Sequence, residues 1–429
     1  MLHLISRDLN QQSGIMKIAI IGAGAAGCFA AARLGEKIRR SGSPEAAEIH
    51  VYESGTRPLA KVRITGGGRC NLTNSFRMVK SAEAVYPRGA RLMKRLLKQF
   101  SHADTMAWFE EAGVPLVVQA DECVFPASQT SEDIIAALLR SMQAAEVRLH
   151  TGYRAKRIEQ MADGGYRIAF TNDQTAKADV VIVTTGGSPR QSGLDFLAPL
   201  HLETLPPVPS LFSLTLEGHP LGALSGHVVQ DVAVRIPGTK LAAQGTLLIT
   251  HQGLSGPAIL RLSSYAARFL HTAGYRAPLA INWWGPHNET GILACLRQLT
   301  AAQPNKQLTN IVPSHLTARL WATLLELCGV QADTRAKDLH AKTLQRLAAQ
   351  LSNHTFTIAG RNPHKEEFVT CGGIALAEIN PNTLECKKHP RLYFAGEVLD
   401  VDAVTGGFNL QAAWSMADAV ARAVAQGWS

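Results

Sequence analysis

The chain is poor in charged residues, which make up 18% of its 429 residues, against about 25% in typical globular proteins. It also lacks any uninterrupted apolar run of about 18 residues, the minimum for a membrane-spanning helix, so we expect no membrane association. Hydrophobic residues reach 46%, enough for large buried cores, which excludes a disordered chain. At about 150 residues per domain, the length predicts two or three domains.

The seven cysteines show no arrangement that would let them act together. Their number is odd, they are widely spaced and no C-x-x-C pair occurs, which argues against a disulfide framework, a zinc site and a dithiol redox centre. Residues Met1 to Gly14 lack the apolar core of a signal peptide, and we interpret them as a disordered tail or an extension before the natural start. These absences predict a cytoplasmic protein without a bound metal.

The net charge of +9 comes without the basic blocks of a nucleic-acid-binding arm. The densest basic stretch, Arg91 to Lys98, places its charges at helical spacing beside Leu92, Leu96 and Leu97. We interpret it as the exposed face of an amphipathic helix rather than a polyanion site. We therefore expect no nucleic-acid partner, while the positive excess favours an anionic cofactor or substrate.

The first part of the chain has the pattern of a βαβ unit. Lys17 to Ile21 is a short apolar strand, Ala25 to Leu34 follows at helical period, and Ile49 to Glu53 reads as a second strand. Residues 80–145 read mostly as helices, over Pro87 to Phe100, Thr105 to Ala112 and Ile134 to Met142, with Ser131 capping the last.

Strands dominate the next part. Arg148 to Ile158 and Tyr166 to Phe170 form a predicted hairpin with Asp163-Gly-Gly165 as its turn. Asp179 to Thr185 is rich in Val and Ile and predicts a fully buried strand of a parallel sheet.

The character of the sequence changes after Gly187. The segments that follow are a predicted rigid linker (Leu205 to Pro209), an alternating strand region (Leu211 to Ile249), a helical region (288–350), two strands (Phe356 to Ile358 and Leu392 to Ala395) and a closing helix (Asn409 to Ala425). The two ends of the chain are therefore predicted to form one domain, into which the middle is inserted.

A glycine motif, Gly22-Ala-Gly24-Ala-Ala-Gly27, lies directly between the first strand and the first helix. In such a turn the first glycine permits the tight bend, the second lets a pyrophosphate approach, and the third lets helix and strand pack closely. The phosphates would lie at the helix N-terminus. Glu53 ends the second strand, where it suits a ribose hydroxyl and would repel a 2′-phosphate, so FAD or NAD is favoured over NADP.

Three further segments favour FAD. The stretch from Lys61 to Asn74 is rich in glycine, polar and basic, as expected of a chain that runs against a large flat cofactor. Val183-Thr-Thr-Gly-Gly187 ends a strand in small residues that can pass beneath a dinucleotide. Near the C-terminus, Glu397 follows a strand and could hold ribityl hydroxyls. The turn from Gly406 to Asn409 could aim the last helix at the flavin pyrimidine, where its dipole would stabilise negative charge.

With these motifs the sequence resembles the BaiN/YhiN-like FAD-dependent oxidoreductases, also known as the aminoacetone oxidase family. The resemblance rests on the Gly22 turn and on Gly66-Gly-Gly-Arg-Cys-Asn-Leu-Thr-Asn74, followed by Thr250-His-Gln-Gly-Leu-Ser-Gly-Pro257, His364-Lys-Glu-Glu-Phe-Val-Thr-Cys-Gly-Gly373 and Phe394 to Gly407. It implies an α/β fold: a Rossmann-like FAD-binding domain of the two-dinucleotide-binding type, with an inserted β-barrel domain and a small helical domain.

The corresponding boundaries are 16–204 and 371–429 for the FAD-binding domain, 205–285 and 351–370 for the barrel, and 286–350 for the helical insert. The motifs and the resemblance together predict a set of residues that bind FAD non-covalently: Gly22, Gly24, Ala25, Ala26, Gly27, Glu53, Ser54, Lys61, Arg63, Gly67, Gly68, Arg69, Asn71, Leu72, Thr73, Ala155, Thr185, Gly186, Gly187, Gly396, Glu397, Asp400, Gly406, Gly407, Asn409 and Leu410.

The chemistry is less closely defined than the cofactor. No second G-x-G-x-x-G occurs, so electrons come from the substrate itself or from NAD(P)H that visits the flavin as a transient reductant. The family suggests both amine oxidation with oxygen as acceptor and reduction of enone-like small molecules, and fold resemblance does not choose between them. The alternatives are a flavin-dependent RNA-modifying protein and a non-catalytic FAD-binding redox sensor.

Candidate side chains at the flavin are Asn71, His251 and Cys371. A lone cysteine such as Cys70 or Cys371 is more often a packing residue, and His251 is more often a structural hydrogen-bonding residue, although its loop could hold an acid or base. His364 and Lys365 could meet an anionic group but read more simply as a solvated turn. The sequence therefore assigns no catalytic residue, and it leaves the oligomeric state open.

Overall fold

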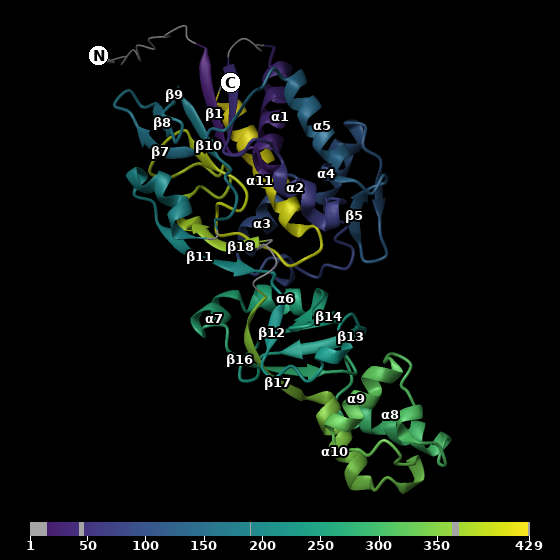
Figure 1. The fold of residues 1–429 in the computed structure, drawn as a ribbon. Coiled ribbons are helices and arrows are strands. Elements are labelled where there is room, and N and C mark those ends of the chain that lie inside the picture. Colours follow the sequence, from purple (N-terminus) through teal and green to yellow (C-terminus); the bar gives the residue numbers. More distant parts are fainter. Residues whose placement is uncertain (1–14, 43–46, 189, 363–368, 428–429) are drawn as a thin grey trace, which may run out of the picture.

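The computed structural model describes residues 15–42, 47–188, 190–362 and 369–427. The leading segment Met1 to Gly14 and the pair His364 and Lys365 lie outside these residues. Figure 1 shows the chain as an upper body that contains both the first and the last described residues, a β-barrel below it, and a helical lobe at the far end. The predicted α/β class with a Rossmann-type sheet, a barrel and a helical insert is confirmed.

The upper body is built on a five-stranded sheet in the order β19-β10-β1-β2-β6, in which every neighbouring pair is parallel. Its strands are β1 (Met16–Ile21), β2 (Ala47–Glu53), β6 (Arg148–Thr151), β10 (Val180–Val183) and β19 (Leu392–Phe394). All four residues of β10 are buried, because a parallel sheet is covered on both faces. The carboxyl ends of these strands meet at one edge of the sheet.

Helices α1 (Ala25–Arg40) and α11 (Phe408–Gln426) pack together on one side of this sheet, and a three-stranded antiparallel sheet lies on the other (Figure 1). That second sheet consists of β7 (Ala155–Gln160), β8 (Tyr166–Phe170) and β9 (Thr175–Ala178). The remaining elements of this body are α2 (Ala60–Ile64), η2 (Thr65–Gly68), β3 (Thr73–Asn74), η3 (Ala82–Ala84), α3 (Ala90–Leu96), α4 (His102–Glu111), β4 (Leu116–Val118), β5 (Cys123–Pro126), α5 (Ser131–Ala144), η4 (Gln191–Leu200) and η8 (Leu376–Glu378).

The barrel closes in the order β12-β15-β14-β13-β16-β17. Its elements are β12 (Leu214–Leu216), η5 (Gly222–Leu224), β13 (Val228–Arg235), β14 (Ala242–Ile249), β15 (Gly253–Ser255), α6 (Pro257–Tyr265), α7 (Ala267–Thr272), β16 (Ala277–Asn282) and β17 (His354–Arg361). Between β16 and β17 the chain forms the helical lobe, with α8 (Glu289–Ala302), η6 (Leu308–Asn310), α9 (Ala318–Leu327), η7 (Ala336–Asp338) and α10 (Ala341–Ser352). Two paired strands, β11 (Thr204–Ser210) and β18 (Val369–Ile374), connect the upper body to the barrel.

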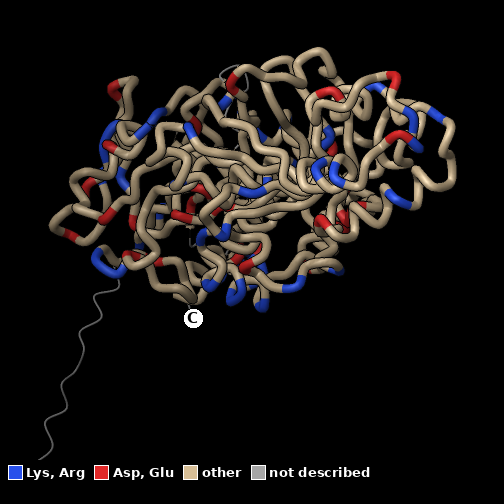
Figure 2. The backbone as a smooth tube through the Cα atoms, turned by 90° about the horizontal axis from the view of Figure 1, so that it is seen from below, with Lys and Arg blue, Asp and Glu red and all other residues tan. Residues whose placement is uncertain are grey.

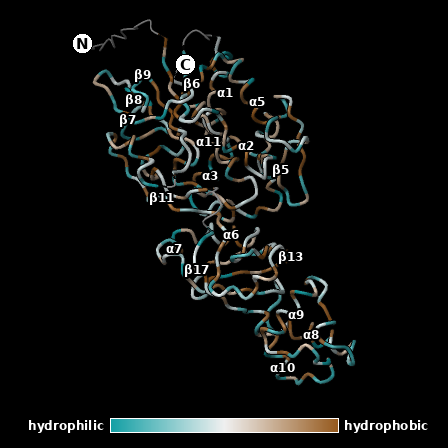
Figure 3. The backbone as a smooth tube through the Cα atoms, in the orientation of Figure 1, coloured by the Kyte–Doolittle hydropathy of each residue, from teal (hydrophilic) through white to brown (hydrophobic). Residues whose placement is uncertain are grey.

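The core is divided between the two bodies. One hydrophobic cluster lies in the upper body, a second is shared by the barrel and the helical lobe, and a small group of Val208, Ala267 and Cys371 lies between them. Figure 3 shows hydrophobic residues concentrated inside each body and hydrophilic residues on the outer loops. Figure 2 shows Lys and Arg spread along the whole chain, with several close together along the lower edge of that view.

Five local predictions differ from the structure. The predicted strand Arg148 to Ile158 is two strands, β6 and β7, which belong to different sheets. They are separated at Gly152, whose φ of +76° bends the chain. The region 80–145 also contains the short strands β4 and β5 in addition to its helices.

The predicted linker Leu205 to Pro209 forms strand β11. Its prolines are tolerated because it pairs with β18 on one side only, with a bulge between Leu205 and Val208. The helix predicted over Pro87 to Phe100 is confined to α3, because Gly89 adopts a left-handed conformation at its N-cap. Helix α5 is capped by Thr130 rather than Ser131, whose hydroxyl instead donates to the Arg63 carbonyl.

Candidate dinucleotide site

The glycine turn between β1 and α1 has the shape that a pyrophosphate requires. At Gly22, with φ +107°, a Cβ atom would lie 2.6 Å from the Thr184 carbonyl oxygen, and at Gly27 it would collide with the Gly22 carbonyl. At Gly24, in contrast, no atom lies within 4 Å of an added Cβ. Gly24 is also the N-cap of α1, and no side chain caps the first N–H groups of this helix.

Glu53, at the end of β2, fixes this turn. One carboxylate oxygen accepts a hydrogen bond from the Ala23 N–H at 2.9 Å, and the other accepts from the Gly55 N–H at 2.7 Å and the Ser54 hydroxyl at 3.2 Å. The carboxylate therefore lies beside the phosphate turn at the carboxyl edge of the sheet, the position that suits a ribose contact.

The segment from Asn71 to Asn74 packs against the start of α11. The Trp414 indole N–H donates to the Leu72 carbonyl at 3.0 Å, and the Asn74 amide donates to the Gly406 carbonyl at 3.1 Å. With its amide oriented to satisfy both neighbours, Asn71 donates to the Thr73 carbonyl at 3.0 Å and accepts from the Gly407 N–H at 3.2 Å. The segment thereby positions the turn before α11.

The three glycines that precede this segment, Gly66 to Gly68, form a rim of the site with little side-chain bulk. Gly66, Gly67 and Gly68 all have positive φ, and an added Cβ at Gly67 would have no neighbour within 4 Å. The Arg69 guanidinium lies 4.4 Å from the centre of the Phe125 ring. This part of the chain thus presents backbone rather than bulky side chains to a ligand.

Cationic side chains lie along the same rim. The Lys61 ammonium is 3.8 Å from a carboxylate oxygen of Glu397, whose other oxygen accepts from the Thr370 N–H at 2.6 Å. Arg63 forms an ion pair with Glu132. Lys61 therefore joins the segment after β2 to the segment after β19.

Small residues follow β10 where the chain passes Glu397. An added Cβ at Gly187 would collide with the Glu397 carboxylate. An added Cβ at Gly186 would have no neighbour within 4 Å. Thr185 and Gly396 lie at the carboxyl ends of neighbouring strands. Ala155 lies in the separate sheet β7–β9.

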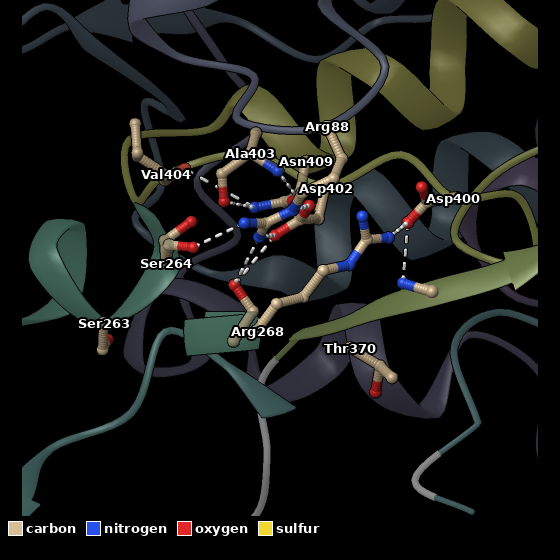
Figure 4. Close-up of polar contacts among 12 residues, drawn as sticks. Arg88, Ser263, Ser264, Arg268, Thr370, Asp400, Asp402, Ala403, Val404 and Asn409 are labelled. Carbon is tan, nitrogen blue, oxygen red and sulfur yellow. Dashed lines mark hydrogen bonds and ion pairs between the residues drawn. The ribbon is translucent and has the colours of Figure 1, made fainter. Parts of the chain in front are cut away.

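Asp400 and Asp402 make contacts that the sequence did not reveal (Figure 4). Asp400 accepts from the Arg268 guanidinium at 2.7 Å and from the Gly372 N–H at 2.9 Å. Asp402 forms a buried ion pair with Arg88 and accepts from the Ser210 hydroxyl at 2.8 Å. Burial raises the pKa of the Asp402 carboxyl, an effect that the Arg88 charge opposes.

These contacts join the upper body to the barrel, because Arg88 also donates to the Ser264 carbonyl of α6 at 2.6 Å and Arg268 belongs to α7. Both aspartates lie in a recognised motif, but nothing in the sequence marks their distant arginine partners. The Asn409 side chain is likewise engaged, since it both accepts from and donates to the backbone of Ala403. The Asn409 side chain therefore anchors the loop that leads into α11.

Of the candidate reactive side chains, the two cysteines are buried and His251 is exposed. Burial raises the pKa of the Cys70 thiol to about 12 and that of Cys371 to about 11, so both behave as packing residues rather than thiolates. His251 is exposed in the turn between β14 and β15. Within the described residues, no group of three His, Cys, Asp or Glu side chains is arranged to hold a metal ion.

The residues at the carboxyl edge of the sheet fit FAD. An added Cβ at Gly24, Gly67 or Gly186 would meet no protein atom within 4 Å, and the start of α1, which has no capping side chain, suits phosphates. The N–H groups of Phe408 to Leu410 have no partner within α11 and would serve the flavin ring.

No helix in the described ranges is both long and apolar enough to cross a bilayer.

This fold and site define an FAD-dependent oxidoreductase with a Rossmann-type nucleotide-binding sheet. More particularly, the chain belongs to the family described as HI0933-like protein Rossmann domain, whose model matches residues 16–423.

Several known proteins are similar over nearly the whole chain. A 3-dehydro-bile acid delta(4,6)-reductase of Clostridium scindens is 28% identical over 422 residues, covering 96% of this chain and 99% of that protein. A ribosomal RNA dihydrouridine synthase of Escherichia coli K12 is 29% identical over 425 residues, covering 94% and 96%. Among solved structures, a 3-ketosteroid delta1-dehydrogenase from Sterolibacterium denitrificans has a TM-score of 0.49 at 10% identity, covering 96% and 99%.

Proposed function

We propose that this protein reduces a carbon–carbon double bond conjugated to a carbonyl group, using FAD held at the carboxyl edge of the sheet. The observation that carries the proposal is the full-length similarity to a reductase whose name specifies a 3-oxo substrate with double bonds at positions 4 and 6. Amine oxidation, the other activity suggested by the sequence, has no such support. When bound, the flavin supplies hydride transfer.

The protein's own part is to bind and orient. The Gly22–Gly27 turn would hold the pyrophosphate, and Glu53 the adenosine ribose. The N-terminus of α11, fixed by Asn71 and Asn74, would face the pyrimidine side of the flavin, where the helix dipole favours negative charge. Such an arrangement would stabilise the reduced cofactor, the form that a reductase must present to its substrate.

The proposed reductant of the flavin is a nicotinamide nucleotide. Since the sequence has no second dinucleotide motif, we propose that NADH or NADPH reaches the flavin directly. The test is the absorbance spectrum of the purified protein under anaerobic conditions, before and after adding each nucleotide. We expect flavin bands that bleach rapidly and return stoichiometrically when an enone is added. Bleaching by amines, with no return on adding enones, would contradict the proposal.

A second candidate substrate is uracil in RNA. Dihydrouridine forms when the double bond between C5 and C6 of uracil is reduced, and that bond is conjugated to the C4 carbonyl. The similarity to the Escherichia coli ribosomal RNA dihydrouridine synthase therefore supports the same bond chemistry on a much larger substrate. Reoxidation of the reduced flavin by uridine-containing RNA, compared with a steroid enone, distinguishes the two.

A further inference from the structure

The positive charge of this protein is concentrated in one segment. Residues 77–98 contain seven basic residues and one acidic residue, a net charge of +6 out of +9 for the whole chain. Six of the seven are exposed: Arg77, Lys80, Arg91, Lys94, Arg95 and Lys98. The side chain of the seventh, Arg88, is mostly buried and paired with Asp402. We call the six exposed residues the basic face.

Helix α3 carries half of this face. Leu92, Met93 and Leu96 are buried beneath it, while Arg91, Lys94 and Arg95 of the same helix are exposed. Lys98 follows two positions after the last residue of α3. Across the described residues these side chains form no ion pair, and Arg95 alone donates a side-chain hydrogen bond, to Asn382. The charge is thus available to a partner.

The chain between Lys80 and Arg91 lies directly on the loop that leads into α11. The Tyr86 hydroxyl donates to the Phe408 carbonyl at 3.1 Å, and the Val85 carbonyl accepts from the Val404 N–H at 2.9 Å. Gly89 lies so close to Val401 that a Cβ would approach its side chain to 2.6 Å. The part of the basic face on either side of this segment, at Lys80 and Arg91, therefore borders the end of the site where the flavin ring is expected, whereas Lys98 lies next to Gln99, which accepts from Arg422 near the other end of α11.

We propose that the basic face is where the phosphate backbone of an RNA substrate docks, so that one of its uracils reaches the flavin. This rests on the second candidate substrate of the proposed function. A row of exposed Arg and Lys suits a polyanion, because each phosphate contact releases counterions. A membrane surface suits it less, since the apolar side of α3 is buried and cannot enter a bilayer.

The test compares two variants with the same change in charge. The first is Arg91→Glu/Lys94→Glu/Lys98→Glu. The control is Arg297→Glu/Arg319→Glu/Lys342→Glu, at three exposed positions of the helical lobe. Binding of fluorescent oligouridylate is measured by anisotropy over a range of salt concentrations. Vesicles of phosphatidylcholine and phosphatidylglycerol serve as the alternative anionic surface.

We expect the basic-face variant to bind RNA on the order of tenfold more weakly, with its salt slope reduced by about 2 for three lost phosphate contacts. The control should bind like the natural protein, and both should keep their FAD. Equal RNA binding by both variants, no RNA binding by the natural protein, or loss of vesicle binding alone would overturn the proposal. If the helix variant misfolds, Arg77→Glu/Lys80→Glu tests the same face outside α3.

RNA binding is measured without turnover, so the docking surface and the proposed reductase activity can be contradicted independently of each other. A protein that binds RNA through the basic face but reduces neither RNA nor enones would contradict the proposed function alone. One that reduces enones but binds RNA equally well in both variants would contradict the docking surface alone.

Discussion

The Thr73 hydroxyl donates a hydrogen bond to the side-chain carbonyl oxygen of Gln411 at 2.6 Å, joining two fully buried side chains that lie 338 positions apart in the sequence. The Gln411 amide in turn donates to the Ser415 hydroxyl at 3.0 Å, which donates to the Phe100 carbonyl at 2.8 Å. This buried chain of hydrogen bonds ties the segment after the glycine run to helix α11. The Thr73 hydroxyl is therefore one of the contacts that hold α11 in place, beside those of Asn74 and Trp414.

Replacing that hydroxyl with a methyl group should be costly. Thr73→Val keeps the side-chain shape but leaves the Gln411 oxygen buried without a donor, which typically costs about 1–3 kcal/mol of folding free energy. We expect a lower urea midpoint and weaker FAD retention. Thr73→Ser keeps the donor and should retain FAD, so equal losses in the two variants would show that the hydroxyl is not responsible.

Gly24→Val should abolish FAD retention without unfolding the protein. Gly24 has a φ of −83°, which any residue can adopt, and no protein atom lies near its added Cβ. The valine side chain would instead occupy the space expected for the pyrophosphate. The measurement is the ratio of flavin to protein absorbance after purification, with Gly427→Val, at the far end of α11, as control. Stoichiometric FAD in the Gly24 variant would refute the phosphate-turn assignment.

Glu53 offers a graded test. Glu53→Gln keeps an oxygen that can accept from Ala23 or Gly55, whereas Glu53→Arg removes both contacts and adds a cation beside the turn. We expect FAD affinity to fall modestly in the first variant and on the order of a hundredfold in the second, corresponding to about 2.7 kcal/mol. Titration of the apoprotein with FAD measures both. An unchanged affinity in Glu53→Arg would place the ribose contact elsewhere.

The barrel should lose stability in mild acid through His354. This buried side chain accepts from the Trp283 indole N–H at 3.2 Å, and burial lowers its pKa to about 4, against about 6.5 in an unfolded chain. Because the unfolded state binds the proton first, stability should fall as the pH drops from about 6.5 to about 4, by up to roughly 3 kcal/mol.

Urea unfolding at about pH 7 and about pH 4.5, compared with the His354→Gln variant, measures this contribution. The variant cannot take up the proton, so its stability should depend less on pH across this window. Parallel pH dependence in the two proteins would show that His354 does not control it.

Local patterns predicted the parts of the fold that depend on short stretches of sequence. The Gly22 turn, the second strand ending at Glu53 and the closing helix follow from spacing alone, because a glycine turn and a βαβ unit are local structures. Strand β11 was missed because its prolines are acceptable only beside a partner, β18, that lies about 160 residues away.

Contacts between distant segments also determine the structure of the loop from Asp400 to Gly407, before α11. Asp400 and Asp402 are visible in a motif, but whether they face solvent, cofactor or another side chain depends on Arg268 and Arg88. Arg268 comes from α7, beside the barrel, and Arg88 from a segment more than 300 positions before Asp402. Side-chain pairing across long sequence separations has no local signature, so the sequence could not reveal this junction.

The paired strands β11 and β18 also bear on how such a chain could have arisen. Ser210 lies opposite Val369, at the spacing of about 5 Å typical of neighbouring antiparallel residues. Everything between them therefore leaves the nucleotide-binding body and re-enters it at one point. A single genetic insertion at that point could have added the barrel, and its later removal with a short reconnecting turn would leave every strand of the parallel sheet in its original order.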